Sequence, residues 1–109
     1  MNNSSLGTAA LYILLTLSES ERHGYSIMKE VERMSSGEVR LGPATLYTTL
    51  KRLLAEGLIV EIGERTDPTM IRRQERRRYY ALSAQGKRVV RQELGRMEQL
   101  VKQFKAKLA

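Results

Sequence analysis

Apolar side chains recur every three or four positions in four segments of the chain, which is the spacing of helices that bury one face. These segments cover residues 5–17, 25–34, 43–56 and 84–108. In the first segment the buried stripe would consist of Leu6, Ala10, Ile13, Leu14 and Leu17. In the third segment it would consist of Leu46, Leu50, Leu53 and Leu54. The pattern therefore predicts four helices, of which the last is the longest.

Between the third and fourth helices the period changes to two, as in a strand with one buried face. Within residues 58–64, Leu58, Val60 and Ile62 alternate with Ile59, Glu61 and Gly63. A second strand ends with residues 76–82, so the two segments predict a β-hairpin with a long loop. Residues 39–41 are predicted as a further short strand that pairs with this hairpin.

Cap and turn residues mark the ends of these elements. Pro43 stands at the first position of the third helix after Gly42, Gly57 supplies its left-handed stop, and Ser83 precedes the last helix as an N-cap. A helix followed by a β-hairpin is the order of a winged helix-turn-helix. The predicted fold class is mainly α with a small β-hairpin. Residues 1–82 would form a winged helix-turn-helix DNA-binding domain, and residues 83–109 a C-terminal dimerisation helix.

The composition narrows the class of protein. The 109 residues allow one domain, and the apolar fraction of 41% is ordinary for a globular chain. The absence of cysteine excludes disulfides and cysteine-based zinc sites and suits a reducing cytoplasm. The apolar residues 11–17 are too few to span a bilayer, which takes ~20 residues, and lack the flanks of an export signal. We expect a cytoplasmic protein without cofactors or membrane association.

The net charge of +7 gathers in the later part of the chain. Residues 1–40 carry four basic and five acidic side chains, residues 41–82 carry eight and five, and residues 83–109 carry seven and two. Excess positive charge favours nucleic acids through counterion release. Five arginines lie within residues 72–78, at the tip of the predicted hairpin. A run of charge is usually a solvated face, but no acidic run balances this one, and the expected phosphate contacts are Arg72, Arg73, Arg76 and Arg77.

The third predicted helix has a polar side opposite its leucines. This side carries Ala44, Thr48 and Arg52, flanked by Thr45 and Lys51. Small side chains near the start would allow close approach to base edges, while the cations near the end would reach phosphates. A solvated face would also be polar, but threonine is a poor helix former with no structural reason to be there. We expect this helix to enter a DNA groove.

The last predicted helix carries a narrow apolar seam with spacings of 4, 3, 4, 3 and 4 residues. The seam consists of Val90, Leu94, Met97, Val101, Phe104 and Leu108. A period of 3.5 residues is typical of paired helices, so we expect a homodimer. A helix folded back on its own domain, or one lying on a membrane surface, is the alternative. Leu11 and Leu15 form a second apolar face on the first helix, which either a partner subunit or the last helix of the same chain would cover.

Other functions fit the sequence less well. An enzyme is a poor alternative because the chain has one histidine and no cysteine, no glycine-rich phosphate loop and no carboxylate pair at a suitable spacing. We therefore expect no catalytic residue and no metal site. A winged-helix module that binds proteins instead of DNA is the main alternative, and it would tolerate replacement of Arg72, Arg73 and Arg77.

Short motifs follow one another along residues 6–90. They are Arg22-His23-Gly24-Tyr25, Leu41-Gly42-Pro43-Ala44-Thr45-Leu46-Tyr47, Leu50-Lys51-Arg52-Leu53, Glu56-Gly57-Leu58-Ile59 and Arg78-Tyr79-Tyr80-Ala81-Leu82-Ser83-Ala84-Gln85-Gly86. In this combination the chain resembles the PadR family of bacterial transcriptional regulators. Its single short C-terminal helix is similar to the smaller branch of that family.

The resemblance implies a homodimeric repressor of an inverted-repeat operator in double-stranded DNA. The recognition helix would begin at Pro43 with Tyr47 on its DNA side, and residues 72–78 would form the wing. His23 would have a structural role at the start of the second helix. The family often has serine where this chain has Gly42, so only backbone N–H groups are expected to hold a phosphate there. A small-molecule effector could bind at the dimer interface, among Leu11, Leu15, Met97 and Phe104.

Overall fold

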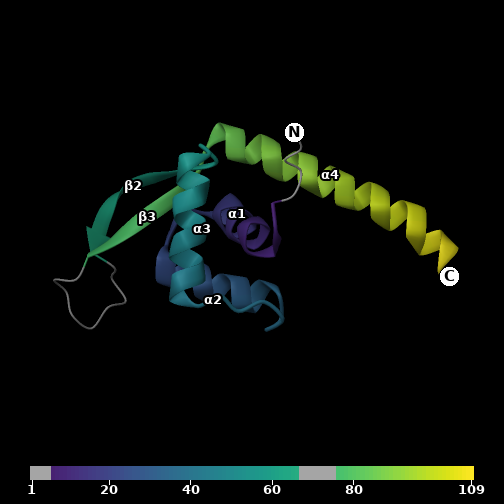
Figure 1. The fold of residues 1–109 in the computed structure, drawn as a ribbon, viewed down its shortest axis with the longest axis horizontal. Helices are drawn as coiled ribbons and strands as arrows, with labels where there is room; N and C mark the ends of the chain where they lie inside the picture. Colours follow the sequence, from purple (N-terminus) through teal and green to yellow (C-terminus); the bar gives the residue numbers. More distant parts are fainter. Residues whose placement is uncertain (1–5, 67–75) are drawn as a thin grey trace.

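Four helices surround a small sheet in the computed structural model, which describes residues 6–66 and 76–109. In chain order the elements are α1 (Thr8–Glu19), β1 (Arg22–His23), α2 (Gly24–Met34), α3 (Pro43–Ala55), β2 (Ile59–Thr66), β3 (Arg76–Leu82) and α4 (Ala84–Lys107). Figure 1 shows α1, α2 and α3 packed together, with the β2–β3 hairpin on one side and α4 projecting from the other. The predicted fold class and all four predicted helices are confirmed. Helix α1 begins and ends slightly later than predicted.

The core lies where the helical periodicity placed it. The predicted stripe of α1 is buried in full, and on α3 only Leu54 is partly exposed. Helix α2 adds Ile27 and Val31, the sheet adds Ile59 and Tyr80, and α4 adds Val90. On the second apolar face of α1, Leu11 and Leu15 are partly buried against this core, and α4 contacts α1 within the same chain.

The sheet differs from the prediction in two respects. Its strand order is β1-β3-β2, so the third strand is Arg22–His23, paired with Tyr79 and Tyr80. Residues 39–41 are not a strand, because the backbone of Val39 forms hydrogen bonds with the Ser35 hydroxyl instead. On β2, Ile59 is buried and Val60 is 44% exposed, so Leu58, Val60 and Ile62 do not form one buried face.

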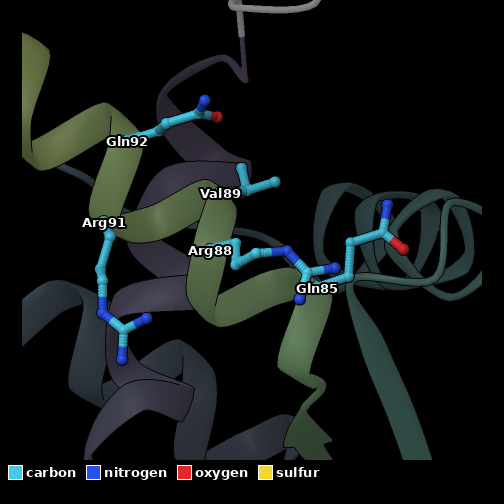
Figure 2. A pocket seen from close by; sticks show the side chains of 5 residues that line it. All are labelled: Gln85, Arg88, Val89, Arg91 and Gln92. Carbon is cyan, nitrogen blue, oxygen red and sulfur yellow. The ribbon is translucent and has the colours of Figure 1, made fainter.

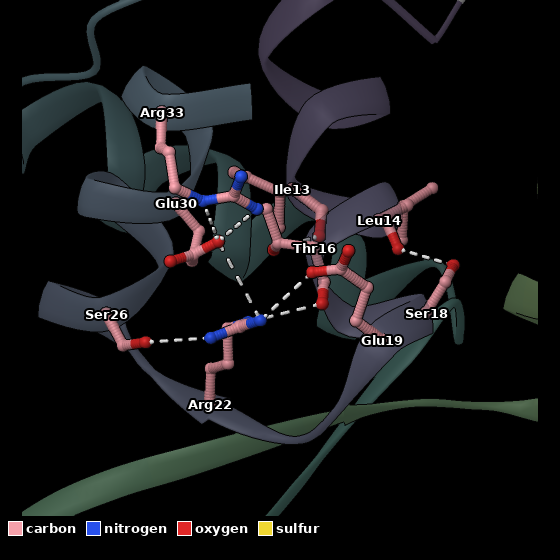
Figure 3. Close-up of polar contacts among 9 residues, drawn as sticks. All are labelled: Ile13, Leu14, Thr16, Ser18, Glu19, Arg22, Ser26, Glu30 and Arg33. Carbon is pink, nitrogen blue, oxygen red and sulfur yellow. Dashed lines mark hydrogen bonds and ion pairs between the residues drawn. The ribbon is translucent and has the colours of Figure 1, made fainter. Parts of the chain in front are cut away.

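Arg22 joins the end of α1 to α2 through several polar contacts (Figure 3). Its guanidinium donates to the Thr16 carbonyl and the Ser26 hydroxyl, both at 3.3 Å, and to the Glu19 carboxylate at 3.1 Å. The same group lies 4.0 Å from Glu30, which also pairs with Arg33 at 2.8 Å. This arginine therefore has a structural role, since its donors are used within the domain.

The start of α4 is fastened to the turn between α3 and β2. The Ser83 hydroxyl donates to the Gly57 carbonyl at 2.7 Å and accepts from the Gly86 N–H at 2.9 Å, which confirms Ser83 as the N-cap. The Ser83 N–H donates to the Leu58 carbonyl at 3.1 Å. Gly57 has φ of 76°, the left-handed conformation expected of a helix stop. We refer to Gly57, Leu58, Ser83 and Gly86 as the clasp.

We expect Gly86→Ala to destabilise the fold, because a β-carbon at this position would stand 2.1 Å from the Leu58 carbonyl oxygen. A backbone atom cannot be displaced cheaply, so the loss should be about 2 kcal/mol or more. Gly95→Ala, in the same helix with no atom within 4 Å of the added carbon, should instead gain about 1 kcal/mol. Urea unfolding at equal protein concentrations measures both. Equal stability of the two variants would contradict the close packing of the clasp.

The Glu30 ion pairs should make stability depend on pH. The hydrogen bond from Arg33 lowers the pKa of Glu30, the positive charges of Arg33 and Arg22 lower it further, and partial burial opposes them. A lowered folded-state pKa stabilises the fold above the unfolded value of about 4.3, and this contribution is lost as the pH falls through the folded value. Glu30→Gln should therefore be less stable than wild type at neutral pH, and the difference should shrink in acid. Glu98→Gln, at an exposed site on α4, is the control.

Candidate nucleic-acid interface

Helix α3 presents a fully exposed polar side. Its backbone begins at the Gly42 N-cap with Pro43 at the first position, and its inward leucines fix which side faces outward. All seven predicted contact residues of this helix are exposed: Pro43, Ala44, Thr45, Tyr47, Thr48, Lys51 and Arg52. Tyr47 is 55% exposed. Thr49, by contrast, is buried and donates its hydroxyl to the Thr45 carbonyl at 2.7 Å.

The two cations of this side differ in their surroundings. Arg52 donates to the Leu6 carbonyl at 3.0 Å and lies 3.8 Å from the Glu56 carboxylate. Lys51 is exposed and has no ion pair with the carboxylates that the structure describes. Arg52 therefore has a structural role that sequence reasoning did not anticipate, and Lys51 is the cation available to a ligand.

The base of the predicted wing is formed by β3. Arg72, Arg73 and the side chain of Arg76 lie outside the described residues. Arg77 is partly buried, with its guanidinium carbon 5.2 Å from the centre of the Tyr25 ring. Arg78 lies 3.8 Å from both Glu61 and Glu64 of β2.

Tyr25 and Lys29 are two surface residues that sequence reasoning did not select. Tyr25 is 48% exposed in the first turn of α2, and the Lys29 ammonium lies 5.4 Å from the centre of its ring. The available signal was their spacing: they are four residues apart on the side of α2 away from Ile27 and Val31. An exposed aromatic ring beside two cations is typical of a surface that meets a polyanion.

His23 is a structural residue, as predicted. Its Nδ1 atom accepts a hydrogen bond from the Ser26 N–H at 3.2 Å, which caps α2. Its ring meets that of Tyr79 edge-on at 5.3 Å and is 8% exposed. This contact and that of Arg77 with Tyr25 hold β3 against the start of α2.

The seam of α4 is used only at its beginning within this chain. Val90 is 6% exposed, whereas Leu94, Val101, Phe104 and Leu108 are 45%, 56%, 46% and 83% exposed. Leu100, which the seven-residue pattern omits, is also 44% exposed. Figure 1 shows why: the helix leaves the domain and its end is remote from α1, α2 and α3. The later turns of α4 therefore expose apolar side chains on one side.

An open groove of about 570 Å³ lies along the first turns of α4 (Figure 2). Its described lining residues are Gln85, Arg88, Val89, Arg91 and Gln92. The predicted effector residues Leu11, Leu15, Met97 and Phe104 are not among them. Within residues 6–66 and 76–109, no group of acidic or histidine side chains is placed to hold a metal ion. No helix in the same ranges is long and apolar enough to cross a membrane.

An exposed helix α3 followed by a β2–β3 hairpin, on a base of α1 and α2, defines the winged helix-turn-helix class. Residues 13–92 match the model of the transcriptional regulator PadR-like family. The chain belongs to this family, as the sequence motifs indicated. It is therefore a transcriptional regulator.

Solved structures agree with this assignment. A transcriptional regulator from Clostridium thermocellum has a TM-score of 0.69 and 25% identity, with 88% of each chain covered. A PadR family transcription regulator from Clostridium difficile has a TM-score of 0.67 and 27% identity over 90% of this chain and 98% of that one. PadR of Bacillus subtilis in complex with operator DNA shares the fold, with a TM-score of 0.68 and 22% identity over 83% of this chain and 48% of that one. No curated protein is significantly similar to the sequence.

Proposed function

We propose that this protein is a homodimeric transcriptional repressor that binds an inverted repeat in double-stranded DNA. The observation that carries the proposal is the exposed side of α3, with small residues at its start and Lys51 near its end, beside a hairpin whose base carries Arg77. Small side chains allow the helix to approach base edges, and flanking cations bind phosphates. The regulated DNA places the protein in the cytoplasm.

The DNA-binding unit would comprise residues 1–82. Its expected contacts are Pro43, Ala44, Thr45, Tyr47, Thr48, Lys51 and Arg52 on α3, and Arg72, Arg73, Arg76 and Arg77 on the wing. Of these, Arg52 would contribute least, because the Leu6 carbonyl and Glu56 already engage it. The operator complex of the B. subtilis relative, which has the same fold, supports this use of the surface.

Residues 83–109 would form the dimerisation unit. The apolar side chains exposed on α4 are those that a second copy of the helix would cover, with Leu11 and Leu15 of α1 at the edge of the interface. Two recognition helices held in this way would enter successive major grooves about 34 Å apart on one side of the duplex. An effector bound at the interface would release the DNA by changing the angle between the subunits.

We expect replacement of Arg72, Arg73 and Arg77 by Gln to flatten the salt dependence of DNA binding. Each lost phosphate contact should lower the slope of log K against log salt by about 0.9. Gel shifts with the upstream region of the protein's own gene, across a salt series, give this slope. The control is the triple variant of Arg88, Arg91 and Lys102 to Gln, which removes the same charge from exposed positions on α4. Equal slopes for both triple variants would favour a protein-binding module.

We expect Leu94→Lys with Val101→Lys to yield monomers, because both side chains are exposed in the single chain and would be buried in a helix pair. Two lysines placed in an apolar seam would cost several kcal/mol on association. Mass measurement in solution gives the oligomeric state. Gln92→Lys with Gln99→Lys adds the same charge on the opposite side of α4 and should leave the dimer intact. Dimers in both variants would refute the seam.

A further inference from the structure

Tyr25 is the centre of a small cluster formed by α2 and β3. The Lys29 ammonium lies 5.4 Å from the centre of its ring, and the Arg77 guanidinium carbon lies 5.2 Å from the same point. The ring is 48% exposed, and Lys29 is exposed as well. One solvent-accessible aromatic ring therefore holds two cations that come from different elements of the fold.

The cluster lies where three elements meet. Gly24, the neighbour of Tyr25 in the chain, is so close to α3 that a β-carbon on it would stand 2.8 Å from the Tyr47 hydroxyl. On the other side, the edge-on contact of His23 with Tyr79 holds β3 against α2. The cluster thus fills the gap between the exposed side of α3 and the base of the wing.

The charges in the cluster favour an anion. Lys29 forms no ion pair with any carboxylate that the structure describes. Two cations beside one ring repel each other, and an anion between them removes this repulsion. The ring, through its negative face, holds both cations near the position that such an anion would occupy.

We propose that Tyr25, Lys29 and Arg77 form a clamp for one backbone phosphate of double-stranded DNA. The clamp rests on the proposed function, since it lies between two of the surfaces assigned to DNA. Lys29 and Arg77 bind the phosphate oxygens, and Tyr25 is a positioning residue that orients both cations. Because a phosphate is the same beside every base, the clamp contributes affinity and orientation but no sequence preference.

The salt dependence of binding tests the clamp. Lys29→Gln should lower the slope of log K against log salt by about 0.9, the value for one lost phosphate contact. Lys102→Gln removes the same charge from an exposed site on α4 and should leave the slope unchanged. The probe is the upstream region of the protein's own gene, with an unrelated duplex of equal length to confirm that the loss is independent of sequence.

Two variants of Tyr25 separate positioning from folding. Tyr25→Phe keeps the ring and should bind as wild type does, whereas Tyr25→Leu should bind about threefold more weakly because both cation–ring contacts are lost. Thermal unfolding of each variant shows whether the fold is intact. Equal binding by the Phe and Leu variants overturns the positioning role.

The outcomes distinguish this proposal from the proposed function. If wild type binds the upstream DNA but Lys29→Gln and Lys102→Gln have equal slopes, the clamp is wrong and the DNA-binding function stands. If wild type binds no duplex even at low salt, the proposed function fails and the clamp fails with it.

Discussion

The clasp is the constraint on which the arrangement of this molecule depends. Ser83 accepts from the N–H of Gly86 and donates to the carbonyl of Gly57, so the end of α3, the start of β2 and the start of α4 are joined within a few residues. Only a glycine at position 86 allows the helix backbone to lie this close to the Leu58 carbonyl. No flexible linker separates α3 from α4. The angle between the exposed side of α3 and the long last helix is therefore set by backbone packing.

This rigid joint determines how two sides of the molecule would be related. The polar side of α3 and the hairpin lie at one end, and the exposed apolar turns of α4 lie at the other (Figure 1). If α4 pairs with a second copy, any change in the pairing angle is transmitted through the clasp to α3 without being absorbed. A helix that is misplaced by a fraction of a groove width loses its base contacts, so a small rearrangement at the tails would suffice to regulate binding.

Sequence periodicity predicted most of the fold, because helical stripes and caps depend on neighbours in the chain. The stripe of α1, the leucines of α3 and the caps at Gly42 and Ser83 were all found as expected. The third strand was misplaced for a physical reason. Two residues suffice to pair with an open strand edge, and Arg22–His23 carries no alternating pattern that would mark it as a strand. Val60 was likewise misjudged, because Leu58 lies before the strand proper and does not share its alternation.

The candidate site was less predictable, since the role of a cation depends on which partners the fold brings to it. Arg22, Arg52 and Arg78 all meet carboxylates or carbonyls of their own chain, and only coordinates reveal these contacts. Lys29 and Arg77 are far apart in sequence, yet both lie against Tyr25. A count of basic residues therefore overstates the surface that can hold DNA. The cations that matter are those left without a partner or assembled around a shared ring, and they border the exposed side of α3.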